Sequence, residues 1–237
     1  MSNLFQFKQF GIIHEKSAMK IGTDSLLLAC FAEIDGAKTI LDIGTGTGIL
    51  AIMMAQKSNA KIDAVEIDLS AFEEADSNAK KTKWSSKIKV HHTSIQQFQS
   101  TIKYDLIISN PPFYEEENNV KIKNGQRSKA RHNAELSLNE LAEEVKNRLS
   151  DEGKFWVILP PGEADEFVLI ATKLGLIMYR EIFIKPKPSK SINRIVMCFG
   201  KQKSKSFGEV FTIYDESGRS SEEYYELTRE FLLWKSR

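Results

Sequence analysis

Patterns typical of β-strands alternate with patterns typical of α-helices through most of this 237-residue chain. Strands are predicted at residues 39–42, 62–66, 88–91, 104–109, 154–159, 177–184 and 192–199, and helices at 49–57, 69–80, 138–149 and 163–174. Such alternation indicates an α/β fold with a mostly parallel sheet and helices on both faces. The last two strands follow each other without a helix, which predicts an antiparallel terminal pair.

Both ends of the chain add elements to this pattern. Residues 5–13 predict a short strand or hairpin, and residues 25–32 predict a buried helix capped by Thr23 or Asp24. The tail predicts a strand at residues 210–214 and a helix at residues 222–234. We therefore expect a single domain over residues 1–237, made of an N-terminal extension (1–37), a core (38–200) and a C-terminal elaboration (201–237).

Composition and charge restrict the class of protein. The net charge of +1 provides no overall field for a polyanion, so affinity for nucleic acid would have to come from local patches. No apolar run approaches about 18 residues and the N-terminus lacks a secretory pattern, which predicts a cytoplasmic protein with no membrane segment. Cys30 and Cys198 lie in apolar surroundings and are expected to be buried free thiols. His91 and His92 have no further metal-ligand spacing around them, so we expect no metal.

Ligands of parallel sheets bind beyond the carboxyl ends of the strands. This rule directs attention to the loops after four predicted strands, at residues 42–48, 66–68, 92–95 and 110–113. Each of these loops contains glycine or polar residues: glycines 44, 46 and 48, then Glu66, Ser94 and Asn110. A binding site is therefore predicted where the four loops meet.

The first of these loops is rich in glycine and opens the helix that begins at Ile49. Glycines 44, 46 and 48 let the backbone turn sharply and approach a ligand closely. A dinucleotide-binding fingerprint would need a small residue at position 49, where this chain has isoleucine. Asp42 would repel a pyrophosphate, but it suits the ammonium of a methionyl group. Glu66, which lies 18 residues beyond Gly48 at the end of the next strand, can accept hydrogen bonds from ribose hydroxyls. Together these residues favour S-adenosylmethionine over NAD.

The fourth loop carries Asn110, Pro111, Pro112 and Phe113 directly after an apolar strand. The amide oxygen of Asn110 and the carbonyl of Pro111 can each accept a hydrogen bond from an NH2 group, and the prolines add no competing N–H. Phe113 can stack on a flat heterocycle, which is worth roughly 1–3 kcal/mol. These four residues are candidate catalytic residues for chemistry on an exocyclic or amide nitrogen. The alternative is a strand exit stiffened by proline.

The glycine loop, Glu66 and the Asn-Pro-Pro-Phe sequence together resemble the class I methyltransferases, a family with a Rossmann-like sheet, over nearly the whole chain. More narrowly, the chain resembles the bacterial methyltransferases that modify N6 of adenine 37 beside the anticodon of tRNA(Val). Further residues that carry this resemblance are residues 7–10, His14, residues 18–20, 22–24, 95–98 and 221–228.

The resemblance implies the activity, the partner and the site. The expected reaction is methyl transfer from S-adenosylmethionine to N6 of an adenine in the anticodon loop of a tRNA. The expected cofactor-binding residues are Lys20, Thr23, Asp42, Gly44, Thr45, Gly46, Gly48, Glu66, Ile67, Ser94, Ile95 and Asn110. The family usually has an acid where this chain has Ser94, and a hydroxyl accepts a bond from the adenine amino group more weakly than a carboxylate.

Two basic clusters could contact RNA phosphates. The first follows the Asn-Pro-Pro-Phe loop and consists of Lys121, Lys123, Arg127, Lys129 and Arg131, which we expect to bind substrate RNA. The second consists of Lys185, Lys187, Lys190, Arg194, Lys201, Lys203 and Lys205. For this second cluster, phosphate contact and a solvated lysine-rich surface remain equally good interpretations.

Other functions compete with this prediction. Methylation of a glutamine amide in a protein such as a release factor uses a similar pocket, but such enzymes usually carry an added N-terminal helical domain, and only about 38 residues precede the first core strand. An amino-methyltransferase acting on rRNA or DNA is a further alternative. A catalytically dead binding module would be expected to lose Asn110 or a glycine, and this chain has kept both. An NAD oxidoreductase is disfavoured by Ile49 and by the Asn-Pro-Pro-Phe sequence.

Overall fold

A computed structural model describes the chain except for residues 1–3, 16–21, 35, 113–135, 204 and 235–237. Its strands are β1 (Leu4–Gln6), β2 (Gly11–Ile13), β3 (Thr39–Ile43), β4 (Lys61–Glu66), β5 (Ile88–His92), β6 (Tyr104–Ser109), β7 (Leu149–Leu159), β8 (Ile177–Lys185), β9 (Arg194–Gly200) and β10 (Phe207–Thr212). Its helices are α1 (Thr23–Phe31), α2 (Ile49–Lys57), α3 (Leu69–Lys80), α5 (Leu138–Arg148), α6 (Pro161–Lys173) and α7 (Glu222–Thr228), with a short 3-10 helix, η1 (Ser85–Lys87).

Eight strands form one sheet in the order β10-β8-β9-β7-β6-β3-β4-β5. Neighbouring strands are parallel except where β9 pairs with β7 and with β8. The predicted mostly parallel α/β sheet with an antiparallel terminal pair is therefore confirmed. Strands from the predicted core and from the tail share this sheet, while the assignment of residues 1–237 to a single domain stays a prediction.

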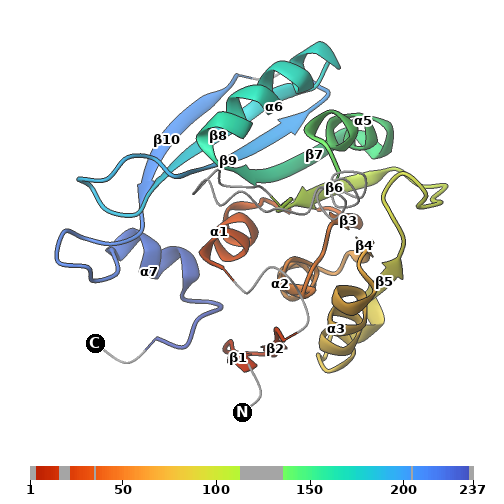
Figure 1. Cartoon of the computed structure of the whole chain (residues 1–237), viewed down its shortest axis with the longest axis horizontal. Helices are drawn as coiled ribbons and strands as arrows, with labels where there is room; N and C mark the ends of the chain where they lie inside the picture. Colours follow the sequence, from red (N-terminus) through yellow and green to blue (C-terminus); the bar gives the residue numbers. More distant parts are fainter. Residues whose placement is uncertain (1–3, 16–21, 35, 113–135, 204, 235–237) are drawn as a thin grey trace, which may run out of the picture.

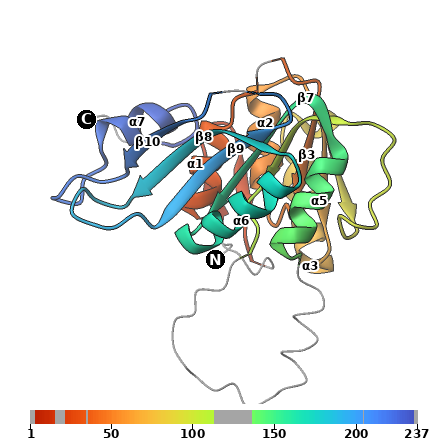
Figure 2. The same cartoon turned by 90° about the horizontal axis from the view of Figure 1, so that it is seen from above.

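Helices cover both faces of the sheet, with α1 and α2 on one side and α5 and α6 on the other (Figures 1 and 2). Successive strand residues point to opposite faces. Within β3, Ile40 packs into the cluster that contains α1 and α2, whereas Leu41 packs into the cluster that contains α5 and α6. This burial on both faces explains why the core strands read as nearly continuous apolar runs.

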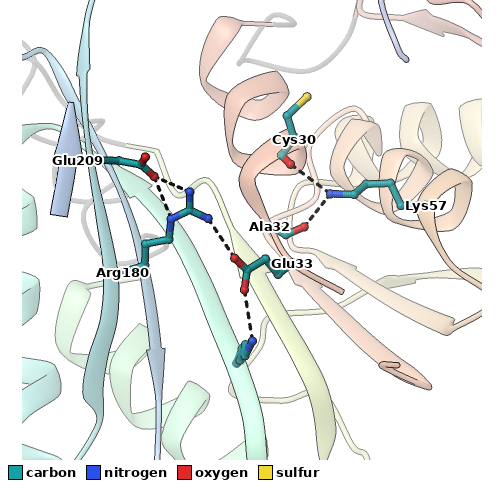
Figure 3. A network of polar contacts seen from close by, with 7 residues as sticks. Cys30, Ala32, Glu33, Lys57, Arg180 and Glu209 are labelled. Carbon is teal, nitrogen blue, oxygen red and sulfur yellow. Dashed lines mark hydrogen bonds and ion pairs between the residues drawn. The ribbon is translucent and has the colours of Figure 1, made fainter. Parts of the chain in front are cut away.

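Polar contacts join the end of helix α1 to helix α2 and to strands of the sheet (Figure 3). Lys57 Nζ donates to the carbonyls of Ala29 and Ala32 at 2.8 and 2.6 Å, which satisfies acceptors at the end of α1. Glu33 pairs with Arg180 of β8 at 3.0 Å, and Arg180 also binds Glu209 of β10. The network therefore ties α1 to the tail strand.

The ends of the chain differ from their predictions. Thr23 and Asp24 do not cap α1: its N-cap is Gly22 with no side-chain bond, because Asp24 instead pairs with Arg194 at 2.8 Å. The tail strand begins at Phe207, before the predicted 210–214. The tail helix α7 ends at Thr228 instead of continuing to residue 234.

A tertiary contact explains why the tail helix is short. Thr228 Oγ1 donates back to Tyr224 O at 2.6 Å, a bond that weakens the helical ladder. Beyond it, Phe231 is buried with 4% exposure and its carbonyl accepts a bond from Lys8 N at 2.8 Å. Burying Phe231 against the N-terminal segment therefore replaces further helical turns.

Within the described residues, no helix is long and apolar enough to span a membrane. Cys198 is buried and Cys30 is partly buried, and both are free thiols in the part of the chain that the structure describes. Burial raises the pKa of each thiol to about 12, so both stay protonated at neutral pH.

Candidate active site

The strand order brings the predicted site loops together at one edge of the sheet. Strands β6, β3, β4 and β5 are consecutive neighbours, and all four are parallel. Ile43 at the end of β3 pairs with Ser109 on one side and Val65 on the other. Ser109 Oγ also donates to Ile43 O at 2.9 Å. The glycine loop and Asn110 therefore leave adjacent strands at the same level.

The glycine loop turns because three of its residues adopt left-handed backbone angles. Gly44, Gly46 and Gly48 have φ values of 70°, 55° and 83°, which cost other residues energy. The N–H groups of Gly44 and Thr45 donate to Val65 O at 3.0 and 3.1 Å, which fastens the loop to the end of β4. The loop then leads directly into the first turn of α2.

The glycines differ in what a side chain would meet. A Cβ at Gly44 or Gly46 would meet nothing within 4 Å, so both face open space. A Cβ at Gly48 would lie 3.3 Å from three atoms of Ala75 in α3. Gly48 thus permits close packing of α3, whereas Gly44 and Gly46 form a stretch of backbone beside open space, called the cradle below.

Asp42 is fully buried beneath this cradle. Its Oδ2 atom accepts bonds from Thr45 Oγ1 at 2.5 Å and from Ala51 N at 3.1 Å, so it holds the loop against α2. Its Oδ1 atom is buried and meets no hydrogen-bond donor among the described residues. Burial raises the pKa of Asp42 to about 7, opposed by the bonds from Thr45 and Ala51, and the charge of Glu66 raises it further.

Glu66 holds two loops at the end of β4. Its Oε2 accepts from Gly46 N at 2.9 Å and its Oε1 from Asp68 N at 3.0 Å. The carboxylate thus lies directly beside the cradle and keeps lone pairs for ribose hydroxyls. Ile67, which follows it, is 52% exposed and offers an apolar surface beside the same loop.

Ser94 lies in the loop after β5, two residues beyond His92. Its hydroxyl accepts a bond from Gln97 N at 3.3 Å and keeps its own O–H and a second lone pair. The next residue, Ile95, is buried with 4% exposure. Its carbonyl accepts from Arg148 Nη2 at 2.8 Å, which anchors the loop to α5.

Asn110 lies at the end of β6 and is 6% exposed. Its Nδ2 donates to Ser25 Oγ in α1 at 3.0 Å. The amide oxygen of Asn110 takes no part in this bond. Pro111 is buried and Pro112 is exposed, so the two prolines leave the sheet toward the surface.

Two supporting residues were missed from sequence. Ser25 lies 85 positions before Asn110, and no local pattern connects them. Asn78 of α3 is fully buried and donates to the carbonyls of Thr47 and Ile13 at 2.9 and 2.8 Å, which joins the glycine loop to β2. A signal did exist for Asn78, because it adjoins the small-residue face of α3 formed by Ala71, Ala75 and Ala79.

Several predicted site residues lie outside the described residues. These are Lys20, Phe113, Lys121, Lys123, Arg127, Lys129 and Arg131. Thr23 is described and is the first residue of α1.

The described histidines near the site bind protein groups. His91 Nε2 lies 2.7 Å from Asp63 Oδ1, and its ring packs 4.8 Å from that of Phe98. His92 Nε2 lies 3.1 Å from Ile67 O. The described residues contain no group of three or more His, Cys, Asp or Glu side chains that could hold a metal ion, and the prediction of a metal-free enzyme stays a prediction.

The residues at this edge fit S-adenosylmethionine. The open cradle at Gly44 and Gly46 accommodates backbone contact with a ligand. The buried Oδ1 of Asp42 needs a donor, which an ammonium group supplies, and Glu66 lies next to the cradle. Two carboxylate acceptors and the open space thus match the ammonium group and the ribose hydroxyls of this molecule.

Comparisons with known proteins identify the family of this chain. The family model of the methyltransferase small domain matches residues 12–169. A protein of Phocaeicola vulgatus named tRNA1(Val) (adenine(37)-N6)-methyltransferase is 40% identical over 97% of this chain and 97% of its own. A protein of Trichodesmium erythraeum with the same name is 40% identical over 98% of both chains.

Solved structures agree on the fold. The crystal structure of a predicted O-methyltransferase from Agrobacterium tumefaciens superposes with a TM-score of 0.68 at 15% identity, over 89% of this chain and 98% of the other. At that identity the likeness concerns the fold alone. The family model and the two relatives nevertheless cover most of the chain, including the glycine loop and Asn110. The chain belongs to the methyltransferase small domain family.

Proposed function

We propose that this protein transfers a methyl group from S-adenosylmethionine to N6 of an adenine in tRNA, specifically adenine 37 in the anticodon loop of tRNA1(Val). The observation that carries this proposal is the position of Asn110. It leaves β6 beside the glycine loop and is held by Ser25. The names of relatives at 40% identity support the choice of base and of tRNA.

S-adenosylmethionine supplies an electrophilic methyl carbon on a sulfonium. In this proposal Gly44 and Gly46 contact it through the backbone, Glu66 binds the ribose hydroxyls, and Asp42 accepts a bond from the ammonium. Ser94 remains the proposed partner of its adenine amino group. Lys20, Thr23, Thr45, Ile67 and Ile95 are proposed to complete this binding site.

Asn110 and Pro111 are proposed to orient the target amine. The amide oxygen of Asn110 and the carbonyl of Pro111 accept its two N–H bonds, which directs the nitrogen lone pair away from the ring plane. Orientation of this kind lowers the barrier without a strong base, because the amine needs only to be held in line with its electrophile. The proton released by the methylated nitrogen passes to water.

Substrate contact adds three further parts to the proposal. The target base leaves its stack at a cost of a few kcal/mol. Phe113 is proposed to stack on it, and Lys121, Lys123, Arg127, Lys129 and Arg131 to bind phosphates nearby. A tRNA substrate also implies a cytoplasmic location for the protein.

Nucleoside analysis tests this function. Purified protein is incubated with S-adenosylmethionine labelled in the methyl group and with tRNA1(Val) transcript, and a nuclease digest is separated by mass. We expect labelled N6-methyladenosine, and none from a transcript with guanine at position 37. Label in a protein fraction alone, or in another nucleoside, would reject the proposal.

Asn110→Ala is the matching variant. It removes the amide acceptor while leaving the glycine loop intact, so methylation should fall below detection while cofactor affinity stays within about threefold. Calorimetric titration with S-adenosylhomocysteine measures that affinity. Equal loss of binding and methylation would count against the assigned role.

A further inference from the structure

The loop between β8 and β9 lies at the same edge of the sheet as Asn110. Strand β9 runs antiparallel to both β7 and β8, and β7 runs parallel to β6. Strand β8 therefore ends at Lys185, and β9 begins at Arg194, on the edge where β6 ends at Ser109. Strand β10 is parallel to β8, so residues 213–220 follow it at this edge as well.

The segments 186–193 and 213–220 are fastened to each other, and both views show them side by side (Figures 1 and 2). The carboxylate of Glu216 accepts from Ser189 N at 2.7 Å and from Ser189 Oγ at 2.8 Å. Tyr214 N donates to Pro186 O at 3.0 Å. The β8–β9 loop is therefore held in a defined position beside the tail.

The charge of this loop is positive and only partly neutralised. The sequence contains no acid from residue 183 to 208. Arg194 pairs with Asp24 at 2.8 Å, so we leave it out of the surface. Within the described parts of the chain, Lys185 and Lys187 donate long bonds to the carbonyls of Pro188 and Glu216, at 3.5 and 3.4 Å, and Lys190 is exposed.

Two acids of the neighbouring segment 213–220 are already engaged. The carboxylate of Glu216 holds Ser189, and Asp215 pairs with Arg219 at 3.2 Å. Hydrogen bonds from Ser217 and Arg219 lower the pKa of Asp215, so it stays ionised. Lys185, Lys187 and Lys190 thus make the β8–β9 loop positively charged, and we call this part of the surface the site corner.

The spacing of strands sets the distance from the target pocket. From β6 the order runs through β7 and β9 to β8, which is three strand intervals. At about 4.8 Å per interval, the end of β8 lies roughly 14 Å from Asn110 along the edge. A base held at Asn110 would therefore leave its flanking phosphates within reach of this corner.

We propose that Lys185, Lys187 and Lys190 bind phosphates of the RNA strand that flanks the methylated adenine. This inference rests on the proposed function and names a second contact surface for the same substrate. It divides the second basic cluster of the sequence into two parts. Lys201, Lys203 and Lys205 follow the end of β9 and therefore lie at the opposite edge of the sheet, away from Asn110.

A pair of charge-reversed variants tests the surface. Lys187→Glu with Lys190→Glu changes the site corner, and Lys203→Glu with Lys205→Glu makes the same change in net charge at the far edge. Binding of tRNA1(Val) is measured by filter retention at several salt concentrations. We expect the first pair to weaken binding at least about tenfold and to reduce the slope of log K against log salt by roughly 1–2.

The far-edge pair should bind tRNA within about twofold of the unmodified protein, and both pairs should bind S-adenosylhomocysteine normally. Because Lys187 is partly buried, the neutral pair Lys187→Gln with Lys190→Gln is measured too, and its melting temperature is compared with that of the unmodified protein. An equal loss of tRNA affinity in both pairs, or no loss in the site-corner pair, would contradict the proposal that these lysines bind RNA. If tRNA binding depends on the site-corner lysines but no adenine is methylated, the RNA-binding surface is supported and the proposed reaction is rejected.

Discussion

Two glycines of the same loop allow the roles of folding and cofactor binding to be separated. Gly46 and Gly48 both have left-handed φ values, of 55° and 83°. A Cβ at Gly46 meets nothing within 4 Å, whereas a Cβ at Gly48 lies 3.3 Å from Ala75 Cα, Cβ and O. The variants Gly46→Ala and Gly48→Ala therefore add one methyl group to the same loop in different surroundings.

The expected loss of stability differs between them. Left-handed geometry costs alanine roughly 1–2 kcal/mol, and the less flexible unfolded chain returns about 0.4–1 kcal/mol. Gly46→Ala should therefore lower the free energy of unfolding by about 1 kcal/mol. Gly48→Ala adds overpacking against the Ala75 backbone, typically about 1–3 kcal/mol, for a total of about 2–4 kcal/mol. At this chain length, the melting temperature should fall by roughly 3 °C and 10 °C respectively.

The effect on cofactor affinity should have the opposite order. The methyl group of Gly46→Ala enters the open cradle and should raise the Kd for S-adenosylhomocysteine at least about tenfold, which is roughly 1.4 kcal/mol. Gly48→Ala directs its methyl toward α3 and should bind within about threefold at 20 °C. Thermal denaturation and isothermal titration calorimetry measure the two quantities. A larger loss of affinity in Gly48→Ala, with both variants folded, would refute the assignment of the cradle.

Three other perturbations follow from the site. Ser25→Ala removes the hydroxyl that accepts a bond from Asn110 Nδ2, so the amide is held less firmly and kcat should fall roughly tenfold with unchanged cofactor affinity. Ser25→Thr should retain most activity, and equal rates for both variants would contradict this. Glu66→Gln weakens charge-assisted bonds to Gly46 and to ribose, and calorimetry should show an affinity at least about tenfold lower. The pKa of Asp42 is about 7 in the folded protein and 3.8 in the unfolded chain. As pH rises from about 4 to 7, the unfolded chain therefore loses this proton before the folded protein does. The contribution of Asp42 to the free energy of unfolding then falls by up to about 4 kcal/mol. Urea titrations should show Asp42→Asn gaining stability relative to the unmodified protein over that range, and a constant difference would disprove the shift.

Elements with strong local patterns were predicted closely. Helices α2 and α3 and strand β6 have the bounds that their apolar patterns indicate. Strand β7 starts at Leu149, five residues before its predicted start, because the polar residues 150–153 form an irregularity in its pairing with β6. Local pattern thus locates buried elements but not the irregular pairing at their ends.

The candidate site divides in the same way. The glycine loop and Asn110 could be recognised because each is a local arrangement after a strand. The contact of Asn110 with Ser25 could not, because it joins positions 85 residues apart. Similarly, Lys187 and Lys203 look alike in sequence, and only the direction of β9 places them at opposite edges.

A crystal structure with S-adenosylhomocysteine bound is the most direct test of this account. We predict that the ligand lies over Gly44 and Gly46, with its ribose at Glu66 and its sulfur directed toward Asn110. Ligand bound elsewhere, for example in the depression lined by Lys38, Lys57 and Lys61 at the opposite edge of the sheet, would contradict it.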